Sequence, residues 1–363
     1  MTTPLVQSIA TEGDFFVPAF ELRMRGRPAE PDVVRDVISV SYRDSLTDVD
    51  SFDVVINNWD AATRSFKYAD DTRFDPGTEV ELWMGYRGGS GLEKMIRGEI
   101  TSLRPSFPAA GQPTLTISGL NLLHRLRKEQ RSETYLDKTD SEIAEAAGRR
   151  LDIRVDTKPQ REPRHAYLLQ DNAYDVVFLM ERARANGYDL FVTDDDHLYF
   201  GPSTEVPRPT YDLRYGGSLV EFQPELTTAG QVGEVVVRGW DPIRKEKIEY
   251  RAKPGELATQ GLGGAVRKSY EQRKEIVADR VVESPAEAKR LAVEILQRIA
   301  KGLVTATGST VGLPKLRAGG VVEVGGLGSR FTGRYFISDT THAIGDGGYT
   351  TQFGCRREEV KGN

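Results

Sequence analysis

A chain of 363 residues with 38% hydrophobic side chains is long enough to build two to three globular units, each with its own core. Its 49 basic and 54 acidic residues give a net charge of −5, which argues against nucleic acid or an anionic membrane as the main partner. The single cysteine excludes an internal disulfide framework, and no segment approaches the ~18 uninterrupted apolar residues of a membrane-spanning helix.

The first third of the chain has the alternating pattern of short β-strands separated by turns. In residues 51–57 and 79–86 every second side chain is apolar, so one face of each strand is expected to look into a core. Several short strands of this kind predict a barrel or a sandwich. The expected inward-facing side chains are Phe52, Val54, Ile56, Val80, Leu82, Met84 and Tyr86.

Residues 139–204 predict a small α+β unit between two β-rich regions. A short helix begins near Thr139, with Ser141 or Asp140 as its expected cap, and a second helix is expected to end at Gly187. Two strands follow, joined by an acidic turn at residues 194–196. One side of the second helix is expected to carry Val176, Val177, Met180 and Ala183.

Residues 205–363 return to strands. The segments GEVVVRGWDP and EKIEYRA predict neighbouring strands, and a Gly-rich segment at 259–269 predicts a mobile loop. The clearest helix of the chain covers about 285–301, where Ser284, Pro285 and Glu287 form an expected capping box and Gly302 a stop. Cys355 falls at an inward-facing position of the last strand, which favours a small buried hydrophobe over a reactive thiol. The expected apolar face of the helix consists of Ala288, Leu291, Ala292, Ile295, Leu296 and Ile299.

One strand pattern occurs twice in the chain. The segments DPGTEVELWMGYRGG, MIRGEITSLRPSF and TLTISGLN are followed much later by RAGGVVEVGGLGS, RFTGRYFISDTTHAI and YTTQFGCR. The repeat predicts two similar β-barrel modules, 1–138 and 205–363, with the α+β domain 139–204 between them. It also matches Gly98 with Gly333, and both are predicted to be tightly packed strand positions.

A search for catalytic chemistry is negative at the level of sequence. The four histidines lack a metal-binding spacing, there is no CxxC, and no nucleophile elbow or phosphate loop is present. The run Asp194–His197 is the best metal candidate, but a solvated turn between two strands is the favoured interpretation. We therefore predict no enzyme, with no catalytic, cofactor-binding or metal-binding residues.

Two tryptophans are candidate binding residues. Trp59 and Trp240 each precede an aspartate at the end of a strand, in NNWD and RGWD. Either can be a core corner, which is the favoured interpretation, or an interface anchor. Two basic runs, HRLRKEQR and RKSYEQRK, predict either solvated faces or contacts with an acidic partner subunit or a charged channel.

Several segments together resemble a known family. DSFDVVINNWD, FLMERARANGYDLFVTDDDHLYFGP, VGEVVVRGWDP and the C-terminal run from GLPKLRAGG to GGYTTQF resemble, in the same order, the late control protein D family of contractile phages. That family is similar to the baseplate hub of contractile tails and to the N-terminal hub part of VgrG spike proteins.

The resemblance implies a structural hub of a contractile phage tail or phage-tail-like injection system. Its implied partners are two further copies in a homotrimer, a spike protein on one side, the inner tube protein on the other, and other baseplate proteins. Three chains with two barrels each imply a pseudo-sixfold ring that adapts the sixfold tube to the threefold spike. The implied location is the bacterial cytoplasm during synthesis and then the assembled particle, without membrane insertion or nucleic acid specificity. The alternative is a particle-borne or secreted hydrolase or carbohydrate-binding β-protein, which needs a carboxylate pair or metal in a cleft.

Overall fold

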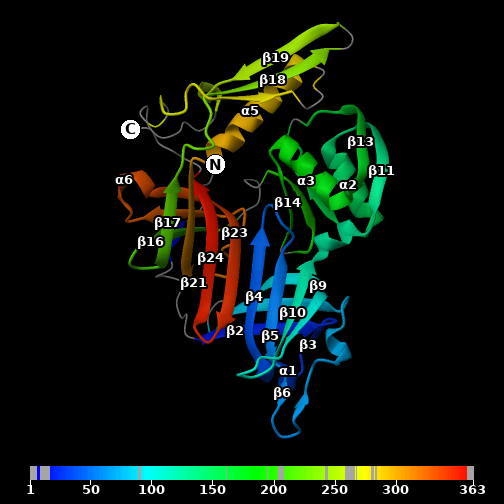
Figure 1. Ribbon diagram of the computed structural model, residues 1–363, viewed down its shortest axis with the longest axis vertical. Coiled ribbons are helices and arrows are strands. Elements are labelled where there is room, and N and C mark those ends of the chain that lie inside the picture. The colour runs from blue at the N-terminus through cyan, green and yellow to red at the C-terminus, as the bar shows by residue number, and fades with distance from the viewer. Residues whose placement is uncertain are drawn as a thin grey trace.

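The computed structural model describes residues 6–8, 17–88, 91–160, 162–193, 195–202, 208–241, 244–257, 266, 268–278, 282 and 284–357. The fold is mainly β, as the sequence predicts, and its largest sheet contains fourteen strands (Figure 1). No described helix is long and apolar enough to cross a membrane.

Eight antiparallel strands of this sheet lie side by side in one row (Figure 1). Strands of both halves of the chain contribute, because β4 pairs with β23 in the middle of the row. The sheet continues beyond this row, because further strands follow β9 in the first half of the chain and β23 in the second half. In order, the row is β17 (Leu219–Leu226), β21 (Val304–Val311), β24 (Gly348–Arg357), β23 (Gly333–Gly345), β4 (Val37–Ser45), β5 (Ser51–Asn57), β10 (Thr114–Asn121) and β9 (Gly91–Ser106). The continuing strands are β8 (Glu79–Arg87), β2 (Val17–Met24) and β3 (Arg27–Pro28) after β9, and β22 (Val321–Gly325), β16 (Thr210–Arg214) and β1 (Val6–Ser8) after β23.

The repeat seen in the sequence is a repeat of five strands. The order β4-β5-β10-β9-β8 in the first half, here called the first strand set, recurs as β17-β21-β24-β23-β22 in the second half, here called the second strand set. Two β-bulges recur with it: Ile38 and Val220 are the extra residues of β4 and β17, and Thr101 and Ser338 those of β9 and β23. The sixth strands differ, because β2 is antiparallel to β8 whereas β16 is parallel to β22.

The bulges correct the predicted match between Gly98 and Gly333. Counted from the bulges Thr101 and Ser338, the counterpart of Gly98 is Tyr335. Gly98 is tightly packed, because a Cβ there would lie 2.2 Å from the backbone oxygen of Leu120. Gly333 instead has a φ of +151° and faces the flexible side chain of Arg357, so backbone conformation rather than packing requires glycine there.

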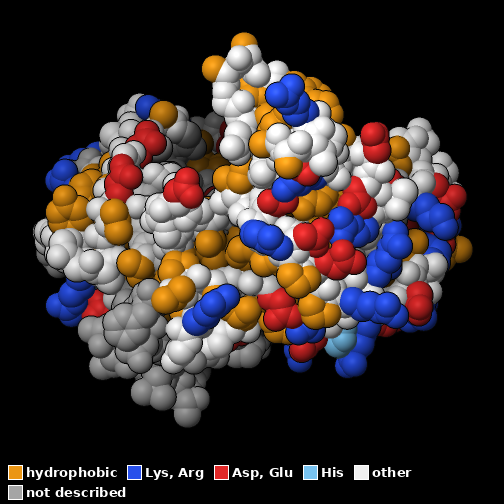
Figure 2. All heavy atoms as spheres, turned by 90° about the horizontal axis from the view of Figure 1, so that it is seen from below, with side chains coloured by type: hydrophobic (Ala, Val, Ile, Leu, Met, Phe, Trp, Pro, Cys, Tyr) orange, Lys and Arg blue, Asp and Glu red, His pale blue; other side chains and the backbone are white. Residues whose placement is uncertain are grey.

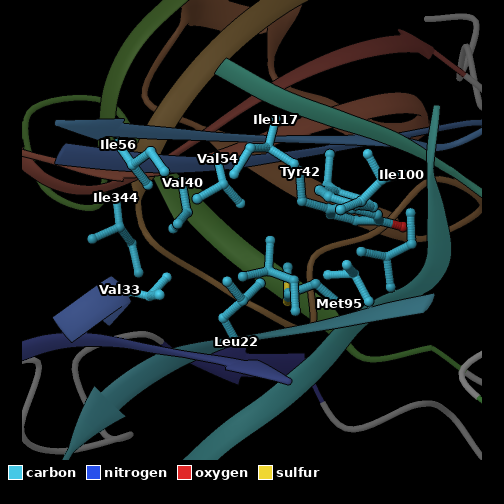
Figure 3. Close-up of a cluster of buried hydrophobic side chains, with 14 of the residues drawn as sticks. Leu22, Val33, Val40, Tyr42, Val54, Ile56, Met95, Ile100, Ile117 and Ile344 are labelled. Carbon is cyan, nitrogen blue, oxygen red and sulfur yellow. The ribbon is translucent and has the colours of Figure 1, made fainter. Parts of the chain in front are cut away.

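The first core lies between β4, β5, β8, β9, β10 and β2, and the predicted inward faces of β5 and β8 form much of it. Side chains of the second strand set also enter this core: Ile344 of β23 packs beside Val33 of α1 (Pro31–Asp36) and Ile56 (Figure 3). A second core, which includes the buried Cys355, fills the second strand set. The two strand sets therefore share both a backbone ladder and apolar packing.

The middle unit contains two helices, α2 (Asp140–Arg150) and α3 (Asp175–Asn186). Thr139, not Ser141 or Asp140, caps α2, since its hydroxyl accepts from the Glu142 amide and the Glu142 carboxylate accepts from Thr139 in return. Asp140 is unavailable as a cap because its buried carboxylate binds Arg182. Gly187 ends α3 in the left-handed conformation, as predicted, but Val177 is exposed and Phe178 and Leu179 are buried instead. The strands of this unit are β11 (Gln130–Lys138), β13 (His165–Tyr174), β12 (Val155–Thr157), β14 (Asp189–Val192) and β15 (Leu198–Gly201).

A further unit is inserted between β17 and β21. Strands β18 (Glu234–Asp241) and β19 (Glu246–Ala252) form the predicted neighbouring pair, β20 (Lys274–Val277) joins β18, and α5 (Pro285–Lys301) packs on them. Ser284 caps α5 through a bond from the Glu287 amide, and the helix ends at Gly302, both as predicted. Most of the Gly-rich segment predicted as a loop, 259–269, lies outside the described residues.

Candidate assembly surfaces and the joint between the strand sets

One face of the eight-strand row carries mostly short polar side chains. The opposite face supplies the cores, so the alternation of each strand separates an apolar side from a polar side. The strand registers place the polar side chains in continuous rows across the sheet, for example Ser41, Asp53, Ser118 and Ser102. We call this surface the polar face. Its other members include Thr307, Ser309, Thr350, Gln352, Thr341, Ser39, Asn57, Thr114 and Thr116.

Charge on the polar face is sparse: the exposed Arg43 lies near its middle, and Arg104 and Asp53 form a local pair. The Arg104 guanidinium lies 3.1 Å from the Ser118 hydroxyl and 3.4 Å from the Asp53 carboxylate, and Ser118 in turn donates to Asp53. Glu221 and Glu225 add negative charge at the β17 end of the row. The face is thus hydrophilic without a strong charge of one sign.

The loop between β21 and β22 fastens the two strand sets together. Arg317 of this loop is only 4% exposed, and its Nη2 donates to the backbone oxygens of Lys94 and Met95 in β9, both at 3.0 Å. The guanidinium also lies over the Tyr42 ring, 4.5 Å from its centroid. Asp44 of β4 completes this joint.

Asp44 connects both strand sets at the same point. Its carboxylate accepts from the Ala318 amide at 3.0 Å and from the Thr340 hydroxyl of β23, and lies 3.9 Å from the Arg317 guanidinium. At the start of the same loop, directly after β21, the Tyr86 hydroxyl of β8 donates to the Gly312 oxygen at 3.0 Å. Buried polar groups of one set therefore find their partners in the other set, which fixes the relative position of the two sets.

Asp50 lies beside this joint and is also buried. Its carboxylate accepts from the Asn121 side chain at 2.7 Å and from the Ser45 amide at 3.2 Å. Burial, together with the nearby Asp44 carboxylate, raises the pKa of Asp50 to about 8. A cavity of about 30 Å³ borders Asp44, Asp50, Asn121 and Arg317 and is large and polar enough to hold one water molecule.

The four histidines have structural partners. His342 of β23 is fully buried between the Leu316 oxygen at 3.0 Å and the Tyr349 hydroxyl at 3.1 Å, and burial holds its pKa well below the ordinary value. His124 lies 3.0 Å from Glu99, His165 3.2 Å from Asp140 and His197 2.9 Å from Asp156. Each of these contacts joins neighbouring elements of the fold.

The acidic turn between β14 and β15 holds the middle unit against the first strand set. Asp196 lies 3.0 Å from the Lys94 ammonium and 3.7 Å from the Arg97 guanidinium, both of β9. Asp194 lies outside the described residues. Among the residues that the structure describes, no group of three or more His, Cys, Asp or Glu side chains is arranged to hold a metal ion.

Trp240 and Trp59 differ in how far they are buried. Trp240 is 56% exposed at the end of β18, so the core interpretation is wrong for it. Trp59, in β6 (Trp59–Asp60), is half-buried and packs on Phe66 of β7 (Ser65–Phe66), which packs on Phe107. Phe66 and Phe107 are 48% and 57% exposed, so the hairpin carries an exposed aromatic cluster. It projects at the lower end in Figure 1, and Figure 2 looks at the molecule from that end, where hydrophobic and charged side chains are intermixed.

Sequence reasoning missed the residues that join the strand sets. Arg317, Asp44 and Asp50 carry no motif, and the burial of Arg317 and Asp44 depends on the docking of the β21–β22 loop on β4 and β9. The basic run at 124–131 is largely a structural contact, since Arg125 pairs with Glu99 and Arg131 with Glu129. A local pattern contains no signal for contacts that form between distant segments.

Several solved structures share this fold, and three of them are described here. The 43 kDa tail protein of prophage MuSo2 from Shewanella oneidensis superposes with a TM-score of 0.72 at 14% identity, covering 94% of this chain and 98% of that one. A tail protein of Neisseria meningitidis gives 0.70 at 15% identity, covering 94% and 97%. A component of the type VI secretion system of Escherichia coli, described as structurally similar to the T4 bacteriophage tail proteins gp27 and gp5, gives 0.57 at 12%, covering 93% and 77%.

The chain thus has the fold of phage tail proteins and of a type VI secretion component, and the resemblance found in the sequence is confirmed at the level of the fold. A family model described as the Alg8 N-terminal domain matches residues 19–346, and the chain belongs to this family. That description names a domain and no activity, so function has to be argued from the geometry. No curated protein matches the sequence.

Proposed function

We propose that the chain is the structural hub of a contractile phage tail or a phage-tail-like injection system. Three copies form a ring, and each copy contributes two similar barrels, so six barrels surround one channel. The observation that carries the proposal is the five-strand repeat with its two pairs of matching bulges, because a doubled module is what converts threefold into quasi-sixfold symmetry. Similar folds in tail proteins of phages and in a type VI secretion component support it.

In this proposal the polar face lines the channel. Short hydroxyl and amide side chains stay hydrated and offer a passing chain few strong binding points, which suits a conduit. The apolar side of the same strands is occupied by the two cores, so the polar face is the side left available for a lumen. The chain is a structural component and not an enzyme in this role.

The proposed partners are an inner tube protein on the sixfold side and a spike protein on the threefold side, with other baseplate proteins around the ring. The exposed aromatic cluster Trp59, Phe66 and Phe107 and the exposed Trp240 are proposed anchors for such neighbours, since exposed aromatic side chains dominate binding energies at interfaces. The chain is expected to act in the assembled particle after synthesis in the bacterial cytoplasm.

Light scattering of the purified chain at several concentrations tests the proposal. A species of three times the 40.3 kDa chain mass is expected, and electron microscopy of that species should show a ring with a central channel. A monomer or a dimer at all concentrations, also in the presence of the tube and spike proteins, would contradict the hub. A trimer without a channel would contradict the placement of the polar face.

A further inference from the structure

The small cavity beside Asp50 lies where three parts of the chain meet. The first strand set contributes Asp44, Asp50 and Asn121 to its lining. The middle unit contributes the end of β14, and the β21–β22 loop contributes Arg317 and Ala318. In Figure 1, β14 lies next to the end of β4, which brings the middle unit against this corner of the strand set. The cavity is therefore bordered by parts that are distant from each other in the sequence.

Apolar side chains from the same three parts cover the cavity. Leu46 directly after β4, Phe191 of β14 and Ala318 of the loop line the cavity and pack in one buried cluster. The Ala318 amide also donates to the Asp44 carboxylate at 3.0 Å, so a carboxylate of the cavity holds the loop directly. Lifting either the middle unit or the loop would let water reach the carboxylates.

Asn121 connects Asp50 to the middle unit. Its Nδ2 donates to the Asp50 carboxylate at 2.7 Å, and its Oδ1 accepts from the Leu123 amide at 3.0 Å, which caps the short helix η3 (Leu122–Arg127). Leu123 is buried in the core of the middle unit. Asp50 thus holds the middle unit through Asn121, while the other carboxylate holds the loop.

Two buried carboxylates at this place have one nearby guanidinium. Asp44 and Asp50 are each 6% exposed, and the Arg317 guanidinium lies 3.9 Å from Asp44. Ionising both carboxylates where so little water reaches them is costly, and each charge raises the cost for the other. Burial and the nearby Asp44 carboxylate accordingly raise the pKa of Asp50 to about 8. Tyr42, which also lines the cavity, stays neutral because burial raises its pKa well above the ordinary value.

The other charged side chains around the cavity are engaged elsewhere. Lys94 and Arg97 of β9 lie 3.0 Å and 3.7 Å from Asp196 of the middle unit, and Arg97 also lies 3.0 Å from Glu79. Arg208 lies over an aromatic ring of β14. Within the remaining group the guanidinium of the loop balances one carboxylate, and a proton is needed to balance the second.

Hydrogen bonds indicate where the O–H of a protonated Asp50 can point. Its Oδ1 accepts from the Ser45 amide at 3.2 Å and its Oδ2 from Asn121, so both of these partners are donors. The cavity of about 30 Å³ has room for one water molecule, which can accept from Asp50 and donate to Asp44. One buried water would then join the carboxylate that holds the loop to the carboxyl that holds the middle unit.

We propose that this junction is a proton-linked latch: Asp50 keeps its proton while the loop and the middle unit cover the cavity, and releases it when either of them lifts. In the open form water surrounds the carboxylate, and its pKa returns toward about 3.9. Opening therefore releases one proton and becomes easier as the pH rises from about 3.9 to about 8. Below this range both forms are protonated and above it both are ionised, so the dependence disappears. These contacts lie within one chain, so the latch does not depend on the proposed trimer.

Hydrogen exchange measured by mass spectrometry tests the latch on the whole chain between about pH 5 and about pH 8. After correction for the intrinsic pH dependence of amide exchange, the opening constant around the Ala318 amide should rise up to about tenfold per pH unit, because one proton is released. Asp50→Asn keeps the shape of the protonated side chain but cannot ionise, so the rise should vanish. Asp48→Asn is the matched control, since Asp48 lies exposed in the same turn between β4 and β5, and should keep the rise.

Two results of this measurement overturn the latch directly. One is an opening constant that does not change with pH in the native chain, and the other is an equal rise in Asp50→Asn. Amides of β18 report on the inserted unit, which has its own core, and should show no such rise. An equal rise in β18 would indicate unfolding of the whole chain in place of local opening, and would also overturn the latch.

Infrared spectroscopy gives a second measurement that needs no opening. At about pH 7 the native chain should show the carbonyl stretch of a protonated carboxyl, and this band should disappear well above the Asp50 pKa of about 8. Asp50→Asn should lack the band and Asp48→Asn should retain it. Absence of the band in the native chain overturns the proposal whether or not the variants fold.

Discussion

Arg317 should be the most sensitive single residue in the joint between the two strand sets. Replacement by alanine removes two hydrogen bonds to the Lys94 and Met95 oxygens in β9 and the stacking on Tyr42. It also removes the nearby positive charge from the buried Asp44. Two backbone acceptors and a carboxylate then stay buried without their cation.

The magnitude follows from that count of lost contacts. Breaking a buried ion pair by removing one partner destabilises a protein by about 3–5 kcal/mol, and hydrogen bonds to charged groups contribute about 1.5–3 kcal/mol each, partly overlapping with that figure. We therefore expect Arg317→Ala to lose about 3–5 kcal/mol, a large share of the roughly 5–15 kcal/mol that a folded domain has. Arg317→Lys keeps the positive charge but loses the paired guanidinium donors, so its stability should lie between that of the native chain and that of Arg317→Ala.

Urea unfolding followed by circular dichroism and by tryptophan fluorescence measures the loss, and the first transition is the relevant one because the chain has several cores. Arg149→Ala is the matched control, since Arg149 is exposed on α2 with only a 3.8 Å pair to Glu145, and should change stability by less than about 0.5 kcal/mol. A loss below about 1 kcal/mol for Arg317→Ala, or one equal to the control, refutes the reasoning about the joint.

Three further substitutions have defined expectations. Folded Asp50 holds its proton up to about pH 8, whereas an unfolded aspartate releases it near pH 3.9. The free energy of unfolding should therefore fall as the pH rises between these two values. In Asp50→Asn the midpoint of urea unfolding should depend less on pH over this range. Gly98→Ala should lose about 1–3 kcal/mol by thermal unfolding because its Cβ meets the Leu120 backbone, whereas Gly347→Ala, with open space around it, should change little. Ser284→Ala should cost about 1 kcal/mol in the same assay, and an unchanged midpoint would argue against the α5 cap.

Features set by short stretches of sequence were predictable. The alternation in β5 and β8 identified the buried side chains correctly, and Ser284 and Gly302 gave the ends of α5, because strand faces and helix caps depend on neighbours a few residues away. Thr139 was missed as the cap of α2 because two adjacent polar residues compete for that place. Only the tertiary contact between Asp140 and Arg182 decides between them.

Features set by distant segments were not predictable in detail. The repeat itself was visible in the sequence, but a match by glycines was wrong by two positions, since β-bulges at Thr101 and Ser338 rather than glycines keep the register. The burial of Arg317 and Asp44 depends on which strands become neighbours. A single sequence predicts which face of a strand is buried more readily than it predicts which strand is its neighbour in the sheet.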